Sequence, residues 1–327
     1  MPTSTSWSVA AVPKCPAIRT DLMTLPLPAA APTLLSEPRV RWPAGATLGE
    51  GTLWSVRRQS LYWVDILGRT LYRYHPATDA HEQWPFDEEI SALAERAEAP
   101  GLLVTLRSGF ALFDTDTGRV QKLHDPEAHL PGNRFNDGKC DLQGRFWGGT
   151  MDFGCTEPTG SLYRFDAKRH CEKVFDAHFA VTNGPTWSLD GRTMYFNETA
   201  QQRIHAFDFD TATGAISNQR LWLRFAKDDG HPDGMTTDAD GRLWIAHWGA
   251  ACVTCHDPVS AKELLRIALP TSHITNVAFG GPELRTLFIT SARFELTDEQ
   301  LAAQPLAGAL FSVEVDARGR PATAWEG

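Results

Sequence analysis

A short unit recurs along this chain: a polar residue leads into an apolar segment, a glycine turn follows, and a second apolar segment leaves. The clearest copy is Thr182–Glu198, TNGPTWSLDGRTMYFNE, which predicts a β-hairpin that reverses at Asp190-Gly191. Turn glycines of the same kind, Gly144 and Gly241, lie 47 residues before and 50 residues after Gly191. A period of about 40–50 residues with several short strands in each unit is typical of a β-propeller.

Further copies of the unit share its turn and its apolar exit, and they lie at Trp54–Tyr62, Asp141–Trp147, Asp238–Trp244 and Gly280–Phe288. Another unit, at 90–123, has lost the repeat phase, and we expect an irregular insertion at Ala94–Pro100 before its second strand. Six units of about four strands each predict an all-β fold, a six-bladed β-propeller.

A ring of blades needs closure. The strand Arg39–Trp42 can pair with the last blade as its missing strand, which removes an open sheet edge. Little helix is expected, apart from one turn at Thr297–Gln304 with Thr297 as its N-cap. The propeller domain is therefore expected to span residues 37–327.

Residues 1–36 differ in composition from the rest. They contain six prolines, lack a basic start and offer no clean apolar run before a small-residue cleavage site, so a signal peptide is not predicted. We expect a disordered or extended lead-in, with Met23 as an alternative start, and a cytoplasmic protein.

Charge and cysteine usage narrow the class of protein. The formal net charge is −9 and no run of Lys or Arg occurs, which argues against nucleic acid or an anionic membrane as partner. No stretch approaches the ~18 apolar residues of a membrane-spanning helix. The six cysteines are scattered, and the one C-x-x-C pair, Cys252 and Cys255, has only His256 as a further ligand, so we expect buried or half-buried thiols. A globular enzyme for a small molecule, monomer or weak dimer, is expected.

The repeat also places one polar residue per unit at the same point. Counting eight residues back from each turn glycine reaches Asn136, Asn183 and Asp233, where the chain enters the innermost strand of a blade. The gapless alignments add Glu50 and Asn276. Equivalent positions of all blades should converge at one mouth of the central channel, so we expect these five side chains to meet there.

Carboxylate and carboxamide oxygens from separate strands are the ligands that a hard divalent cation requires, so the sequence predicts an axial metal site. Ca²⁺ is the preferred ion, with Zn²⁺, Mn²⁺, Mg²⁺ or Fe²⁺ as alternatives. Plainer interpretations exist, because Asn183-Gly184 and Asp233-Gly234 also suit ordinary turns and Glu50 between two glycines suits a solvated loop. Asn276 is either a ligand or an axial hydrogen-bonding residue.

A cation lies close to one axial residue in the sequence. Arg134 is two residues before Asn136, and residues i and i+2 of a strand share a face, so both can point at a ligand; a surface ion pair of Arg134 is the alternative. His231 and His247 flank the Asp233 hairpin, and whether His231 touches the ligand stays open. No G-x-S-x-G, H-E-x-x-H or phosphate-binding glycine loop offers a competing site.

At these residues the chain resembles the regucalcin/gluconolactonase family of six-bladed propeller sugar lactonases, also known as senescence-marker-protein-like. The resemblance extends from about Leu35 to Val315. Its most specific segments are LGEG at 48–51, RFNDGK at 134–139, GRFWGGTMD at 144–152, TNGPTWSLDG at 182–191 and PDGMTTD at 232–238.

The resemblance implies a role for each candidate. Glu50, Asn183 and Asp233 would bind the metal, with Asp233 also the general base, and Arg134 and Asn136 would hold the lactone. Some members carry an acidic substrate-binding residue shortly after the G-T-M segment. Here Asp152-Phe153-Gly154 follows, so Asp152 is the candidate at this place and the contacts to the distal sugar hydroxyls are expected to differ.

The expected reaction is divalent-metal-dependent hydrolysis of a sugar lactone to the aldonic acid, with pentonolactones and hexonolactones as natural candidates by the same resemblance. Two alternatives remain. One is a metal-dependent phosphotriesterase or arylesterase, and the other is a noncatalytic calcium-binding propeller.

Overall fold

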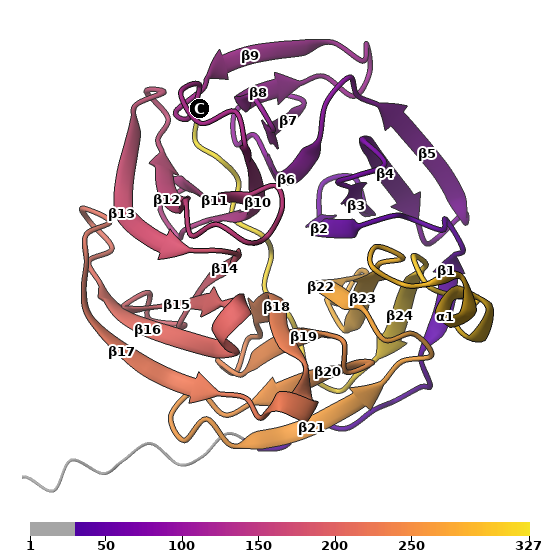
Figure 1. Cartoon of the computed structure of the whole chain (residues 1–327). Helices are drawn as coiled ribbons and strands as arrows, with labels where there is room; N and C mark the ends of the chain where they lie inside the picture. Colours follow the sequence, from indigo (N-terminus) through magenta and orange to yellow (C-terminus); the bar gives the residue numbers. More distant parts are fainter. Residues whose placement is uncertain (1–29) are drawn as a thin grey trace, which may run out of the picture.

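The computed structural model describes residues 30–327, and in this part of the chain six four-stranded antiparallel sheets stand around a common axis (Figure 1). The prediction of an all-β, six-bladed propeller is confirmed. Most of the expected lead-in, residues 1–29, lies outside the described residues.

In every blade the strands follow one another across the sheet from the innermost to the outermost. Blade one has β2 (Gly49–Ser55), β3 (Ser60–Asp65), β4 (Thr70–His75) and β5 (Ala80–Pro85). Blade two has β6 (Ile90–Glu95), β7 (Leu102–Leu106), β8 (Gly109–Phe113) and β9 (Val120–His124). Blade three has β10 (Asn133–Cys140), β11 (Phe146–Asp152), β12 (Gly160–Phe165) and β13 (Cys171–Phe179). Blade four has β14 (Thr182–Trp187), β15 (Thr193–Glu198), β16 (Arg203–Phe209) and β17 (Ile216–Arg224). Blade five has β18 (His231–Thr237), β19 (Leu243–Trp248), β20 (Cys252–His256) and β21 (Glu263–Ala268). Blade six has β22 (Ile274–Gly280), β23 (Thr286–Ser291), β24 (Leu310–Glu314) and β1 (Arg39–Trp42).

The sixth blade is closed by the N-terminal strand, as predicted. β1 pairs antiparallel with β24, with Arg39 opposite Ser312. Just before β1, Thr33 donates from its backbone N and its hydroxyl to the carboxylate of Asp316, at 2.7 and 2.8 Å. Segments from both ends of the propeller therefore share one sheet, and this closes the ring.

The repeated D-x-x-G-R-x-W segments are structural clamps. Asp141 is fully buried, and its carboxylate accepts hydrogen bonds from the Arg145 Nε at 2.7 Å and from the Trp147 Nε1 at 2.8 Å. The second copy is the same, with Asp238 accepting from Arg242 and Trp244. The glycine of each turn has a positive φ, a conformation that residues with a Cβ rarely adopt. The motif therefore stabilises the turn of each hairpin, and its residues do not line the cavity at the channel mouth.

Aromatic stacking joins neighbouring blades. Trp54 of blade one stacks on Phe288 of blade six, with ring centroids 5.6 Å apart, and Phe110 of blade two stacks on Phe165 of blade three at 4.3 Å. Such pairs add about 0.5–1.5 kcal/mol beyond the area that they bury. These contacts tie neighbouring blades together, which matters for any site built from several blades.

The C-terminal tail crosses the propeller from blade six to blades two and three (Figure 1, yellow). Gly319 donates its backbone N–H to Leu284, and Trp325 exchanges backbone hydrogen bonds with Glu95 and Ala97. Residues 320–323 line a cavity of about 100 Å³ together with the distal ends of the inner strands. The tail therefore covers one end of the central channel.

Two local expectations are settled by the structure. The irregular insertion in blade two begins at Arg96 and not at Ala94, because β6 runs to Glu95, where the tail residue Trp325 pairs beside it. The expected helical turn is α1 (Asp298–Ala303), capped by Thr297, which exchanges hydrogen bonds with Gln300. The structure also has two short 3-10 helices, η1 (Thr199–Gln201) and η2 (Lys227–Asp229).

Within residues 30–327, no helix has the length and apolar character needed to cross a membrane.

Candidate active site

One cavity of about 200 Å³ opens at the channel mouth opposite the tail. Much of its polar lining comes from residues near the starts of four innermost strands, which Figure 1 shows around the axis: Glu50 of β2, Arg134 and Asn136 of β10, Asn183 of β14 and Asp233 of β18. The structure therefore brings together all of the residues predicted to bind metal and two of the three predicted to bind substrate.

The inner strands share an irregularity near this point. The pairing register shifts between Glu50 and Leu53 in β2, and equivalent shifts occur in the other five inner strands. A β-bulge bends its strand and re-aims the side chains around it. Each repeat thus contains both an inner-strand entry and a β-bulge close to it.

The entry into β2 shows how a polar side chain is held before such a bulge. The carboxylate of Asp65 accepts backbone hydrogen bonds from Thr47 at 2.7 Å and from Leu48 at 2.9 Å. These contacts fix the chain just before Glu50, which is only 4% exposed.

A chain of hydrogen bonds links the substrate candidates to one metal candidate. The Nη1 of Arg134 donates to the Oδ1 of Asn136 at 2.6 Å, and the Nδ2 of Asn136 donates to the Oδ1 of Asn183 at 2.9 Å. The Nδ2 of Asn183 donates to Thr199 at 3.0 Å. Since an amide oxygen has two lone pairs, the Oδ1 of Asn183 keeps one for a further partner.

The two acidic candidates, Glu50 and Asp233, are both buried and line the same cavity. Burial raises the pKa of Glu50 to about 8, with the carboxylate of Asp137 as the next cause. Burial, followed by the charges of Glu50 and Asp137, raises the pKa of Asp233 well above its usual range. Neither acid forms an ion pair with Lys or Arg within the described residues, so ionising both calls for a cation from outside.

The donor set fits a divalent metal ion. Two carboxylates and one carboxamide oxygen are hard ligands from three strands, and together they would nearly balance a charge of two. Among the side chains that the structure describes, which are those of residues 30–175 and 179–327, no three or more His, Cys, Asp or Glu gather as metal ligands, so a site here depends on Asn183 as its third donor.

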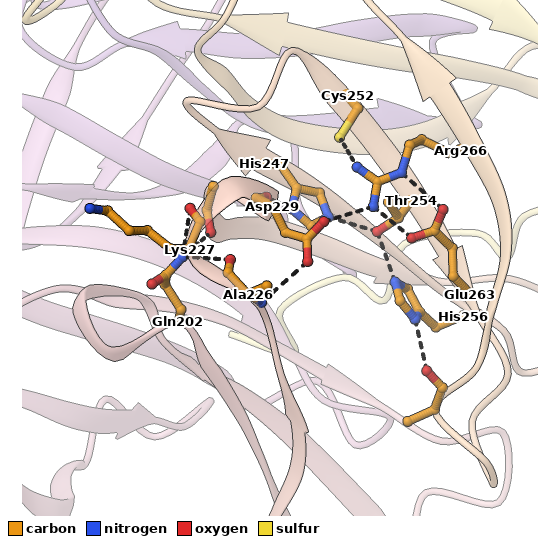
Figure 2. A network of polar contacts seen from close by, with 12 residues as sticks. Gln202, Ala226, Lys227, Asp229, His247, Cys252, Thr254, His256, Glu263 and Arg266 are labelled. Atoms are coloured by element: carbon orange, nitrogen blue, oxygen red, sulfur yellow. Dashed lines mark hydrogen bonds and ion pairs between the residues drawn. The ribbon is translucent and has the colours of Figure 1, made fainter.

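The other sulfur and histidine candidates lie elsewhere, in blade five (Figure 2). His247 is buried and hydrogen-bonds to the carbonyl of Asp229 and to Thr254, both at 2.7 Å. The Sγ of Cys252 contacts Arg266 at 3.4 Å, and Cys255 is buried in the core. Both thiols are buried, as expected.

Of the two residues whose contact with the ligand was left open, His231 lies in the cavity lining and Asn276 does not. His231 lines the cavity, and its Nδ1 lies 3.0 Å from the carbonyl oxygen of Thr199. Asn276 lies behind Glu50 and outside the cavity lining, donating to it at 2.9 Å.

Asp152 is at the end of β11 and does not line the cavity. One oxygen of its carboxylate accepts hydrogen bonds from the backbone of Thr156 and of Glu157, and these bonds lower its pKa. The carboxylate therefore shapes the loop that follows, whose Phe153 ring lies 5.9 Å from the guanidinium of Arg134.

Sequence reasoning missed several residues of the site. Asp137 belongs to the segment RFNDGK, but regular strand alternation would point it away from Asn136. It follows the register shift in β10, accepts a hydrogen bond from the Gly184 N–H at 3.0 Å and acts by its charge on the pKa of Glu50, although it does not itself line the cavity. The rim residues come from loops, turns and the end of β19, none of which carries a repeat signal, and they include Cys155, Thr199, Trp248, Phe294 and Glu295.

Comparison with known proteins finds a matching family model and several similar proteins. The model of the SMP-30/Gluconolactonase/LRE-like region matches residues 48–293. L-arabinolactonase of Azospirillum brasilense is 36% identical over 286 residues, covering 87% of this chain and 92% of its own. Regucalcin of Oryctolagus cuniculus is 33% identical over 277 residues, covering 83% and 92%. The crystal structure of a calcium-binding protein, regucalcin, from Agrobacterium tumefaciens strain C58 superposes with a TM-score of 0.84 at 31% identity, covering 88% of this chain and 97% of that one.

Proposed function

Since this chain belongs to the SMP-30/gluconolactonase/LRE-like family, we propose that it is a lactonase that opens a sugar lactone to the aldonic acid with one divalent cation. The observation that carries the proposal is the meeting of Glu50, Asn183 and Asp233 with Arg134 and Asn136 in one cavity. Similar proteins support both parts, since one is an L-arabinolactonase and another is a calcium-binding protein.

Glu50, Asn183 and Asp233 would hold the cation. When bound, it would withdraw electron density from the ester carbonyl and make a nearby water more acidic. Ca²⁺ suits these oxygen ligands, and Zn²⁺, Mn²⁺, Mg²⁺ and Fe²⁺ are the alternatives to test.

Asp233 is the general base of the proposal. Its carboxylate takes a proton from the water as the water oxygen attacks the carbonyl carbon, and returns that proton to the ring oxygen as the carbon–oxygen bond breaks. Its position in a buried cavity beside Glu50 supports this role, because burial favours the protonated form that exists between the two transfers.

Arg134 and Asn136 position the substrate. The Nη1 of Arg134 is held by Asn136 and by the carbonyl oxygen of Phe135, whereas its buried Nε–H has no acceptor within the described residues. A buried donor without a partner is costly, and an oxygen of the lactone would satisfy it. Asp152 was the third candidate; its carboxylate supports the neighbouring loop, so a direct contact with substrate stays a prediction.

One experiment tests the proposal against its alternatives. The protein is stripped of metal with a chelator, and each of the five cations is restored in turn. Hydrolysis of pentonolactones and hexonolactones, an aryl ester and a phosphotriester is then followed with a pH indicator. Cation-dependent hydrolysis of the sugar lactones alone is expected. Preference for the phosphotriester or aryl ester would replace the proposal, and cation binding without any hydrolysis would favour a noncatalytic calcium-binding propeller.

A further inference from the structure

A third acid enters the cavity from a place that the repeat does not mark. Glu295 lines the cavity from the loop between β23 and α1, and its side chain is exposed at the rim. Among the cavity-lining residues the acids are Glu50, Asp233 and Glu295. The first two are buried and are the candidate metal ligands, so Glu295 is the cavity-lining acid to which no role has been assigned.

The backbone holds Glu295 in an unusual conformation. Leu296 donates its N–H to the carbonyl of Arg293 at 3.1 Å, which makes Phe294 and Glu295 the central residues of a turn. Glu295 has a φ of 64°, a value that turns usually assign to Gly or Asn because a Cβ is strained there. A glycine would form this turn more easily.

Several contacts keep that turn in place. Phe294 donates its N–H to the carbonyl of Thr47 at 2.8 Å, and its own carbonyl lies 3.0 Å from the Nδ1 of His273. His273 in turn stacks on Trp248, with ring centroids 3.9 Å apart. The residue before Glu295 is therefore held through its backbone by two hydrogen bonds, one of them to a histidine that stacks on Trp248.

The opposite rim has a similar feature. Cys155, from the loop after β11 in blade three, also lines the cavity and has a positive φ of 59°. Burial raises the pKa of its thiol; the charge of Arg134 opposes this shift, and the charge of Glu295 adds to it. The loops that follow β11 and β23 thus both contribute to the lining of this cavity.

No hydrogen bond or ion pair of the Glu295 side chain occurs within the described residues. An ionised carboxylate only accepts hydrogen bonds, and its two oxygens suit two neighbouring hydroxyl groups. An anionic group at the same place would be repelled.

We propose that Glu295 selects neutral, polyhydroxylated lactones: it accepts hydrogen bonds from substrate hydroxyls remote from the ester and disfavours lactones that carry a phosphate or carboxylate. This inference rests on the proposed lactonase function. It names the acid that contacts the distal hydroxyls in this chain, in a different blade from Asp152.

The test compares Glu295→Gly and Glu295→Gln with the wild type. Arg169→Gly is the matched control, because Arg169 has a similar φ of 63° in an exposed turn outside the cavity. Both glycine variants should melt at or above the wild-type temperature, since each relieves a strained φ. Kinetic changes in Glu295→Gly alone are then changes of substrate contact.

Three substrates separate the outcomes: a neutral hexonolactone, its phosphorylated counterpart and unsubstituted δ-valerolactone. In both Glu295 variants the KM for the neutral sugar lactone should rise about tenfold with kcat nearly unchanged, as expected for lost hydrogen bonds to a charged group. The KM for the phosphorylated lactone should fall, and that for δ-valerolactone should stay the same. Equal changes for all three substrates, or no change for the sugar lactone, would overturn the inference.

Binding of a sugar lactam, whose ring amide resists hydrolysis, provides a readout that does not need turnover. Calorimetry should show about tenfold weaker lactam binding to Glu295→Gly than to the wild type. If the wild type hydrolyses no lactone, the proposed function fails, while the lactam result still decides the role of Glu295. If the wild type is active and the variants bind lactam equally well, the role of Glu295 alone fails.

Discussion

Asn276 donates a hydrogen bond from its Nδ2 to the Oε2 of Glu50 at 2.9 Å, across the joint between the last blade and the first. The Oδ1 of Asn276 accepts from Thr52 at 2.7 Å, so its amide orientation is set on both sides. The repeat aligns Asn276 with the metal candidates, and the folded ring uses it to orient one of them.

Replacing Asn276 tests that relationship. In Asn276→Ala the carboxylate of Glu50 loses its donor, and the affinity for a divalent cation should fall by about 10-fold or more, as for other residues that orient a ligand. Calorimetric titration of chelator-treated protein with Ca²⁺ measures this. Unchanged cation affinity in a variant that melts like the wild type would show that Asn276 does not position Glu50.

The general base is tested with Asp233→Asn, which keeps the shape of the side chain. The value of kcat for a sugar lactone should fall by about 10²–10⁴-fold, the usual contribution of a proton-transferring residue. Because Asp233 is also a proposed ligand, the assay is run at saturating cation, with Asn183→Ala as the comparison. Asn183→Ala should recover turnover when the cation is raised, whereas Asp233→Asn should not.

Arg134→Ala should act mainly on KM. The guanidinium is buried and is held by Asn136, so its loss removes a donor to the bound lactone without removing the base. We expect KM to rise by about 10-fold, as for a lost charged hydrogen bond, with a smaller change in kcat. Steady-state kinetics measure both, and a large fall of kcat at constant KM would contradict a positioning role.

A pH dependence of stability follows from His247 (Figure 2). Its pKa is lowered to about 4, chiefly by burial; the nearby charges of His256 and Arg266 act in the same direction, and the carbonyl and the charge of Asp229 oppose it. In an unfolded chain the pKa is about 6.5, so between these values the unfolded state binds a proton that the folded state does not. The free energy of unfolding should therefore fall as the pH drops from about 7 to about 4.

Urea unfolding at pH 7 and pH 5 measures this effect. His247 contributes at most roughly 3 kcal/mol over the whole window, by the usual conversion of a pKa difference. In His247→Gln the dependence should be weaker, and part should remain because the pKa of His256 is lowered by burial as well. An unaltered pH dependence in this variant would assign the effect to other groups.

The tail is tested with Trp325→Ala. Trp325 is 1% exposed and stacks on Phe165 at 5.7 Å, so truncation should cost about 3–5 kcal/mol of unfolding free energy. The KM for the lactone should not change, because the tail covers the end of the channel away from the cavity. Denaturant unfolding gives the first quantity, and a stability equal to that of the wild type would show that the tail is only loosely attached.

The sequence alone determined the architecture and the identity of the axial residues. A strand, a glycine turn and a returning strand are local structures, so their spacing is visible in the chain, and a shared phase places Glu50, Asn183 and Asp233 at equivalent points of different blades. Even the closing strand Arg39–Trp42 was predictable, because a ring of sheets cannot leave one blade short.

The tertiary structure decided the rest. Whether Asn276 lines the cavity or stands behind Glu50 depends on the joint between two blades, and the position of Asp137 depends on a bulge in β10. Asp152 faces its own loop, whereas Glu295 reaches the cavity from another blade. The loops at the rim of the cavity do not repeat along the sequence. Their course is set by contacts between residues far apart in the chain, such as Phe294 with Thr47. For this reason the sequence could place the axial residues of the site but not the residues at its rim.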